Sequence, residues 1–471
     1  MQGMNGDKSM QYWQPGLDRT HGPLYLAIAD AIGRAIAAKE LRPGERLPPQ
    51  RRLATALEVD LTTVTRGYTE AQRRGLVEAV VGRGTFVRGA ERTPHTADGV
   101  LPLVDMSMNP PPQSLDPLLQ DALREGLEAV LRQTDIASLM GYHLGGGSPW
   151  AREAGAAWVR PMLASALPAH TLVCNGAQAA LTALLTLLTR PGDVVLAEPL
   201  TYQRFRALAA HLGVRIHAVA TDADGMLPDA LDAACLSLTP KAIYCIPTIQ
   251  NPTTVTMSLP RRQAIAEVVL RHGVAVIEDD AYGRLIGEPV TALAALAPSQ
   301  TWYLATLSKC LSPGLRLAYV VAPDRAAAAR LEGAVRATAL MPPTLMTVLV
   351  SGWIHQGTAA ALCDGVRREI VARQAIAREI LPAGNFVAHP EGPHVWLTLP
   401  PQWHRMAFTA HVRGLGLALA PSDAFLVEGA APNAVRIGLG AAESQAALRT
   451  ALQAVTTALR AEAPPDLADI V

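Results

Sequence analysis

Polar residues that could bind a ligand follow several short apolar runs in this chain. Asn175-Gly-Ala-Gln178 comes directly after such a run and opens a helix, so its backbone amides form an anion site at the helix N-terminus. Glu198-Pro-Leu-Thr-Tyr202 places an aromatic ring after the next run. Three further segments take the same position after later runs: Ile246-Pro-Thr-Ile-Gln-Asn251, Ile277-Glu-Asp279-Asp-Ala-Tyr282, and Thr306-Leu-Ser308-Lys309 continuing to Arg316. Each segment alone is a weak signal, because a single lysine after a strand is usually a surface residue.

The apolar runs that precede these segments alternate with alanine-rich helical stretches. They cover residues 171–174, 194–197, 242–246, 274–278 and 302–305. Strands that alternate with helices at this spacing predict an α/β fold with a mainly parallel sheet. Ligands of such sheets bind beyond the carboxyl ends of the strands, so the polar segments are expected to meet there.

Arginine and threonine residues near the N-terminus form a second group with binding chemistry. The apolar residues that recur every four positions predict one amphipathic helix: Leu24, Ile28, Ile32 and Ile36. Prolines and a glycine in 41–49 end this helix, and two short helices follow, the second introduced by Asp60 as its N-cap. Residues 76–87 contain the turn Gly82-Arg83-Gly84 between two apolar runs and predict a hairpin. This order predicts a winged helix-turn-helix.

Residues 21–88 resemble the GntR-type winged helix over the whole small domain, from GPLYLAIADAIGRAIAAKELRPGERLPPQRRLA to VDLTTVTRGYTEAQRRGLVEAVVGRGTFV. The resemblance implies double-stranded DNA as a partner. It places the following residues against the DNA: Arg51, Thr62, Thr63, Thr65 and Arg66 from the helices, and Arg83 and Gly84 from the wing turn. Hydroxyl and guanidinium groups bond phosphate oxygens, and the first turn of the third helix can enter the major groove.

Two observations qualify the DNA-binding interpretation. At Asp60-Leu61 the chain departs from the commoner pattern of Ser or Thr followed by Arg, which removes one phosphate or base contact. An isolated Thr-Thr-Val-Thr-Arg segment is usually just a solvated helix face, and the complete helix-turn-helix and wing weigh against that alternative. Residues 21–90 carry 11 Lys or Arg and 7 Asp or Glu, a net charge of +4 in a chain whose overall charge is zero. This is the sign that DNA binding requires.

Composition limits the remaining classes of protein. The apolar runs are much shorter than a membrane span, and the first residues lack the apolar stretch of a secretory signal, so a cytoplasmic protein without membrane contact is expected. The five cysteines are scattered and form no Cys-x-x-Cys pair. We therefore expect reduced, mostly buried thiols and no metal site.

Taken in order, the polar segments resemble those of the fold-type I aminotransferases that depend on pyridoxal 5'-phosphate (PLP). The resemblance covers residues 105–464, after a polar linker at 89–104. It implies that Lys309 forms the Schiff base with PLP and that Asp279 pairs with the pyridine nitrogen, keeping the ring protonated as an electron sink. The other implied contacts are Asn251 and Tyr282 on the ring hydroxyl, Tyr202 stacked on the ring, and Ala177, Gln178, Thr306 and Arg316 around the phosphate.

The resemblance also assigns two residues to the amino-acid ligand. Arg436 matches the arginine that clamps an α-carboxylate, and the alternative for it is a strand residue in a surface ion pair. Tyr142 matches the tyrosine of a mobile segment that in many relatives reaches the partner subunit's cofactor. Here the chain has Gly145-Gly-Gly147 where relatives usually have Pro-Ala-Gly, Ala151 in place of Leu, and Asn251-Pro-Thr-Thr254 in place of Asn-Pro-Thr-Gly. These departures remove no implied cofactor ligand, but they leave the identity of the amino acid open.

A GntR-type domain fused to an aminotransferase-like domain is the arrangement of the MocR-type transcription regulators. Membership implies a homodimer that carries PLP as a sensor group and responds to an amino acid, an amine or a vitamin B6 compound. The alternative is a working PLP-dependent aminotransferase with an appended DNA-binding domain, since every residue needed for transamination is present. The complete winged helix favours the regulator, because a metabolic enzyme has no use for it.

Overall fold

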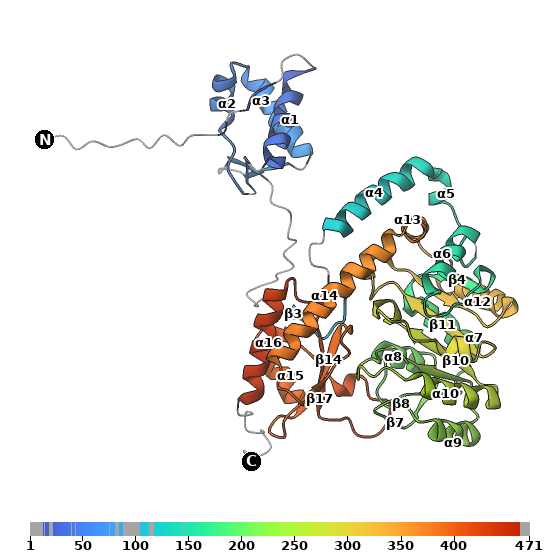
Figure 1. The fold of residues 1–471 in the computed structure, drawn as a ribbon. Coiled ribbons are helices and arrows are strands. Elements are labelled where there is room, and N and C mark those ends of the chain that lie inside the picture. The colour runs from blue at the N-terminus through green and yellow to red at the C-terminus, as the bar shows by residue number, and fades with distance from the viewer. Residues whose placement is uncertain are drawn as a thin grey trace. The chain divides into compact units, whose positions relative to one another are not determined.

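The computed structural model of the 471-residue chain describes residues 13, 15–17, 22–38, 40–42, 44–74, 76–80, 84–87, 104–112, 117–143 and 145–461. The chain divides into two compact units, Met1–Gly99 and Val100–Val471 (Figure 1). Arg83 of the expected wing turn lies outside the described residues, as does the expected linker 89–104 apart from Val104.

The described residues of the N-terminal unit form three helices and a hairpin. They are α1 (Leu24–Ala37), α2 (Gln50–Leu57), α3 (Leu61–Arg73), β1 (Val77–Val80) and β2 (Gly84–Val87). The predicted winged helix-turn-helix is therefore confirmed. Asp60 caps α3, since its carboxylate accepts the backbone N–H of Thr62 at 2.8 Å. Helices α1 and α3 lie so close that a Cβ added at Gly67 would come within 2.8 Å of Cγ2 of Ile28.

The C-terminal unit is built on a seven-stranded sheet. In spatial order the strands are β4 (Thr171–Cys174), β12 (Ala318–Val321), β11 (Thr301–Thr306), β10 (Ala275–Asp280), β9 (Ala242–Cys245), β5 (Val194–Ala197) and β6 (Arg215–Ala218). The neighbours from β11 to β6 pair in parallel, and β12 is antiparallel to both of its neighbours. The expected mainly parallel sheet is thus confirmed.

Helices cover both faces of this sheet. The first face packs on α7 (Gly176–Leu188), α8 (Gln203–His211) and α12 (Arg325–Ala339). The other packs on α6 (Pro149–Val159), α9 (Pro228–Leu238), α10 (Leu259–His272), α11 (Leu293–Leu296) and α13 (Thr344–His355). Strands buried on both faces read as continuous apolar runs rather than as alternating patterns, which is why the runs were visible in the sequence.

A smaller antiparallel sheet lies toward the C-terminus, ordered β13 (Phe386–Val387), β14 (His394–Thr398), β17 (Ala434–Gly438) and β16 (Ala420–Pro421). It shares an apolar core with α15 (Arg405–Gly414) and α16 (Gln445–Arg460). The long helix α14 (Thr358–Ile380) runs beside α16 (Figure 1). Strand β15 (Leu417–Ala418) pairs in parallel with β3 (Val104–Asp105), so the first described residues of this unit join its C-terminal part.

The remaining elements of the described ranges are two helices, one pair of short strands and four 3-10 turns. They are α4 (Pro117–Gln133), α5 (Ile136–Met140), β7 (Thr221–Asp222), β8 (Gly225–Met226) and the 3-10 turns η1 (Pro168–His170), η2 (Gly283–Leu285), η3 (Pro313–Leu315) and η4 (Ser422–Ala424). None of the helices in the described ranges combines the length and the hydropathy of a membrane span. All five cysteines are free and buried, as expected.

Candidate functional site

A recess of about 940 Å³, counting its open mouth, lies at the carboxyl ends of the parallel strands. All nine residues that the sequence assigned to the cofactor line it: Ala177, Gln178, Tyr202, Asn251, Asp279, Tyr282, Thr306, Lys309 and Arg316. We call this recess the Lys309 pocket. The fold thus brings together residues that are up to about 140 positions apart in the chain, because the strands that carry them end at one edge of the sheet.

Lys309 extends into the pocket from the segment that follows β11. Its Nζ donates a hydrogen bond to the backbone oxygen of Asn109 at 2.8 Å. Burial, followed by the positive charges of Arg436 and Arg204, lowers the pKa of Lys309 to about 8. The neutral, nucleophilic form of this amine is therefore more populated near neutral pH than that of an ordinary lysine.

Asp279 is the buried carboxylate of the pocket. The hydroxyl of Tyr244 donates to its Oδ2 at 2.7 Å, and its Oδ1 has no hydrogen-bond partner within the described residues. Burial raises the pKa of Asp279 to about 6, although the hydrogen bond from Tyr244 acts in the opposite direction. A buried carboxylate oxygen without a donor is costly, so Oδ1 is suited to accept an N–H group from a bound ligand.

The opposite end of the pocket is suited to an anion. Helix α7 begins at Gly176 without a side-chain cap, so the first backbone N–H groups of the helix face this end unshielded. The guanidinium of Arg316 lies against Gly176, since a Cβ there would be 3.4 Å from Nη2. Arg316 and the helix amides together form a cradle for a phosphate-like group. Thr306 contributes a hydroxyl that accepts the backbone N–H of Ser308 at 3.3 Å.

Arg436 lies on β17 and is 4 % exposed, so the surface ion pair considered for it does not form. Its Nη1 donates to Oδ1 of Asn251 at 2.6 Å, and its Nη2 donates to the backbone oxygen of Ser107. Its Nε has no hydrogen-bond partner within the described residues. The guanidinium also lies over the ring of Phe425, 4.9 Å from the centroid. The hydrogen bond to Asn251 connects Arg436 to the Lys309 pocket, although Arg436 does not line it.

Several residues of this region were missed by the sequence analysis. Asn109 donates to the hydroxyl of Tyr282 at 2.8 Å and contacts Nδ1 of His394 at 3.0 Å. Burial lowers the pKa of His394 to about 3, so this imidazole is neutral. Tyr244 and Arg204 were missed as well. A signal was available only for Arg204, which lies two positions after Tyr202; the others come from segments whose proximity depends on the tertiary fold.

Tyr142 differs from the other predicted residues. It is 81 % exposed and is not among the described side chains that line the Lys309 pocket. The resemblance to the aminotransferases assigns Tyr142 to the cofactor of a partner subunit, so its role stays a prediction about an assembly.

In the N-terminal unit, Arg51 and Gly84 line one recess between the start of α2, the start of α3 and the hairpin. Arg46 and Gln50, which the sequence analysis did not assign, line the same recess. A Cβ at Gly84 would be 2.8 Å from Nε of Arg46, so glycine leaves room for this guanidinium beside the wing. The recess therefore combines two guanidinium groups with the elements expected at DNA.

The predicted residues of α3 are largely exposed, but their polar groups have partners within the unit. The hydroxyl of Thr62 donates to Asp60 at 2.5 Å, and that of Thr65 donates to Oε1 of Gln50 at 2.9 Å. The guanidinium of Arg66 lies 4.4 Å from the ring centroid of Tyr25. Thr63 is half-buried. A phosphate oxygen can only accept hydrogen bonds, so Thr62 and Thr65 must exchange these partners to donate to DNA.

Comparison with known families agrees with both units. The family described as bacterial regulatory proteins of the gntR family matches residues 24–87. The family described as aminotransferase class I and II matches residues 102–455. The first match identifies a DNA-binding regulatory domain, and the second covers about three quarters of the chain.

Individual relatives share the two-domain arrangement or the fold. The chain is 30 % identical over 432 residues to YdeF of Bacillus subtilis, an uncharacterized HTH-type transcriptional regulator, covering 91 % of this chain and 92 % of YdeF. It is 30 % identical to the vitamin B6 salvage pathway transcriptional repressor PtsJ of Salmonella typhimurium, covering 81 % of this chain and 87 % of PtsJ. Among solved structures, the α-aminoadipate aminotransferase LysN of Thermus thermophilus, in complex with N-(5'-phosphopyridoxyl)-L-leucine, matches with a TM-score of 0.69 and 25 % identity, over 76 % of this chain and 92 % of LysN. The chain belongs to the MocR-type transcription regulators, in which a GntR-type DNA-binding domain precedes a domain of the aminotransferase class I and II family.

Proposed function

We propose that this regulator holds PLP at Lys309 and changes its affinity for DNA when an amino acid, an amine or a vitamin B6 compound binds in the Lys309 pocket. The observation that carries the proposal is the composition of this pocket. An amine, a carboxylate with an unpartnered oxygen and an anion cradle lie within one recess. These three groups match the aldehyde, the pyridine nitrogen and the phosphate of PLP.

The chain's own residues have defined tasks in this proposal. When bound, PLP supplies an aldehyde carbon that exchanges one attached amine for another and a ring that withdraws electrons from it. Lys309 is the resident amine, and its lowered pKa of about 8 favours the neutral form that attachment requires. Asp279 accepts the ring N–H through Oδ1, while Tyr244 holds the other carboxylate oxygen in place. Arg316 and the first amides of α7 bind the phosphate.

Arg436 favours an effector that carries a carboxylate. Its guanidinium is buried, and its Nε is without a hydrogen-bond partner in the described parts of the chain. A planar guanidinium can bind a carboxylate through two parallel hydrogen bonds. In the structure, Arg436 instead donates to Asn251 and to the backbone oxygen of Ser107, and a bound carboxylate would take the place of these acceptors. Among the three effector classes, an amino acid can therefore bind Arg436 beside the Lys309 pocket through its carboxylate, whereas a simple amine cannot.

The second candidate function is transamination by the same pocket. The complete set of predicted cofactor residues and the likeness to LysN favour it. Sustained turnover of an amino acid with a keto acid, together with no affinity for DNA, would support this enzyme and contradict the sensor proposal.

The experiment measures DNA affinity as a function of pocket occupancy. DNA fragments that the purified protein retains from a genomic pool are titrated by fluorescence anisotropy, with and without PLP and a panel of amino acids and amines. We expect the affinity of the wild type to change with at least one compound. Lys309→Ala should lose both the yellow absorbance of bound PLP and this change. If Lys309→Ala responds to the same amine as strongly as the wild type, amine exchange at Lys309 is not the signal.

A further inference from the structure

A second recess, of about 460 Å³ counting its open mouth, adjoins the Lys309 pocket. Ile246 lines both recesses, so the two share one wall. The lining of the second recess is mixed: Leu200, Val255 and Met257 are among its apolar residues, and Thr221, Gln250 and Thr253 are among its polar ones. We call it the Glu198 recess after its one buried carboxyl group. No residue that the sequence analysis assigned to PLP, to the effector or to DNA lines it.

Glu198 is 3 % exposed, and only one of its two carboxyl oxygens has a hydrogen-bond partner within the described residues. Its Oε1 accepts the backbone N–H of Ile246 at 3.1 Å, whereas its Oε2 has no partner within the described residues. Burial raises the pKa of Glu198 to about 7, with Asp279 adding to the rise. An unpartnered buried carboxyl oxygen is costly, and a ligand that offers an N–H group would remove this cost.

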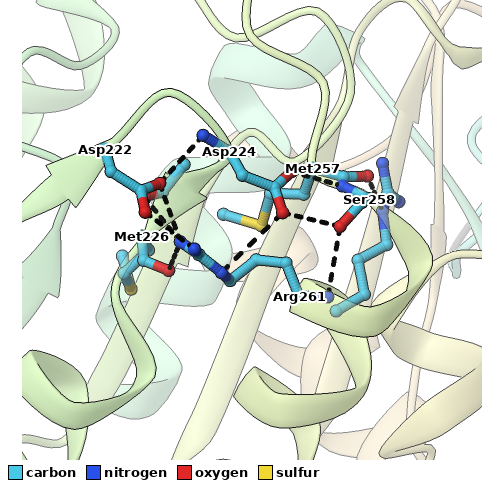
Figure 2. Close-up of polar contacts among 8 residues, drawn as sticks. Asp222, Asp224, Met226, Met257, Ser258 and Arg261 are labelled. Carbon is cyan, nitrogen blue, oxygen red and sulfur yellow. Dashed lines mark hydrogen bonds and ion pairs between the residues drawn. The ribbon is translucent and has the colours of Figure 1, made fainter.

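The exposed residues Thr221 and Asp222 of the β7–β8 hairpin line the Glu198 recess, and we call this side of the recess its mouth. Arg261 on α10 fixes this hairpin: it donates to Asp222 at 2.8 Å and to the backbone oxygen of Met226 at 2.9 Å (Figure 2). Asp224 of the same hairpin accepts the hydroxyl of Ser258 at 2.6 Å. The mouth is therefore held in shape by the protein itself, as expected for a preformed site.

The same contacts decide the electrostatics of the recess. Asp222 lines the mouth, but its charge is compensated by two hydrogen bonds from Arg261. Glu198 lacks such a partner, and its Oε1 only accepts the backbone N–H of Ile246, the residue that lines both recesses. When Glu198 ionises, its carboxylate is therefore the charge of the lining that no cation of the described residues compensates, and this charge is negative. An anion is disfavoured there, and a cation with an apolar body is favoured.

We propose that the Glu198 recess binds a small aliphatic ammonium ion, whose N–H group donates to Oε2 of Glu198 and whose carbon atoms contact Leu200, Val255 and Met257. The charge of the ion compensates the buried carboxylate, and the aliphatic part replaces water on the apolar walls. The site is separate from the amine chemistry at Lys309, so it stands or falls independently of the function proposed above.

The probe that tests this site is trimethylammonium, a tertiary ammonium ion that carries an N–H group but cannot attach to an aldehyde. Two compounds of similar size serve as references: tetramethylammonium has the charge without the donor, and tert-butanol has a donor without the charge. Binding to the full-length protein is measured by isothermal titration calorimetry. We expect the wild type to bind trimethylammonium at least about tenfold more tightly than either reference, as a charge-assisted hydrogen bond requires.

Three variants locate the binding. Glu198→Gln keeps an acceptor for Ile246 but replaces Oε2 by a donor, so the preference for trimethylammonium should disappear. Val255→Phe fills the recess while leaving Glu198 intact, and it should also abolish binding, which keeps the test valid if Glu198→Gln fails to fold. Glu428→Gln removes a partly exposed carboxylate outside the recess and should leave binding unchanged. Equal affinity of the wild type for all three compounds, or retained preference in Val255→Phe, would overturn the proposal.

Discussion

At the scale of single residues, Arg51 offers the clearest test of the DNA-binding surface. It is exposed and lines the recess between α2, α3 and the wing. We expect Arg51→Ala to weaken DNA binding by about 1–3 kcal/mol and to reduce the salt dependence of the affinity, because a phosphate contact that releases a counterion is lost. The measurement is a DNA titration at two salt concentrations.

A matched control for Arg51 is available on α1. Arg34 is also an exposed arginine of the N-terminal unit, but it does not line the recess. Arg34→Ala should leave the affinity and its salt dependence almost unchanged. Equal effects of the two substitutions would mean that the recess has no special role and that only net charge matters.

A second prediction concerns Glu198 and the pH dependence of the free energy of unfolding. Burial raises the pKa of Glu198 from 4.5 to about 7. A carboxyl group with a higher pKa in the folded state keeps its proton preferentially there, so its stabilising contribution is complete below about pH 4.5 and is lost as the pH rises to about 7. The loss is on the order of 3 kcal/mol, since one pKa unit corresponds to about 1.4 kcal/mol.

The Glu198→Gln variant isolates this contribution, because glutamine does not titrate. Urea unfolding followed by tryptophan fluorescence at pH 5 and pH 7.5 should show a smaller decrease in the free energy of unfolding for the variant than for the wild type. The neighbouring titratable groups Asp279, Tyr244 and Cys245 are present in both proteins, so the comparison measures Glu198 together with its coupling to them. An identical decrease in the two proteins would show that Glu198 does not keep its proton in the folded state.

At the scale of elements, the contact between α1 and α3 positions the expected recognition helix. A Cβ at Gly67 would lie 2.8 Å from Cγ2 of Ile28 and 3.2 Å from the backbone oxygen of Tyr25, so Gly67→Ala must push the helices apart. We expect a destabilisation of about 1–3 kcal/mol, which exceeds the gain in helix propensity, and a loss of DNA affinity. Scanning calorimetry of the full chain measures the first effect.

The same helix pair supplies the control. A Cβ at Gly33 of α1 would lie at an ordinary contact distance of 3.5 Å from Leu76. Gly33→Ala should therefore be neutral or slightly stabilising, because only the helix propensity changes. If Gly67→Ala is equally neutral, the close approach of α1 and α3 is not needed for folding or for DNA binding.

At the scale of the whole molecule, we propose a homodimer formed through the region of α4 and α5. Large apolar side chains are exposed along this region of the single chain: Leu118, Leu123, Leu131, Ile136, Met140 and Tyr142. Such a concentration of exposed apolar groups is typical of an interface. Two DNA-binding domains in one dimer then require two half-sites on the DNA.

We predict that charged residues introduced into the α4–α5 region convert the dimer into a monomer. Sedimentation velocity at micromolar concentration should show a dimer for the wild type and a monomer for Leu131→Asp combined with Ile136→Asp, since buried unpaired carboxylates are costly. Leu236→Asp on α9 charges another exposed leucine, which is 69 % exposed, and should leave the dimer intact. A monomeric wild type with PLP bound would contradict the dimer.

Much of this protein was determined by the sequence itself. The apolar runs marked five of the seven strands of the large sheet within one or two residues, whereas β6 and β12 were not among them. Strand β10 extends to Asp280 and so includes the predicted Asp279. Asp60 marked the start of α3, and the polar segments after the runs supplied all nine residues of the predicted cofactor site. Local signals suffice here because capping, strand burial and turn chemistry act over a few residues, and because a parallel sheet brings its strand ends to one edge.

Only the tertiary structure decided which side chains meet from different segments. The strand order, with β12 antiparallel between β4 and β11, follows from long-range pairing that no local pattern encodes. The hydrogen bond of Tyr244 to Asp279, the contact of Asn109 with Tyr282 and the unpartnered oxygen of Glu198 arise in the same way. Each depends on burial and on neighbours distant in the chain, and a residue's type does not reveal whether its polar atoms will find partners once water is excluded.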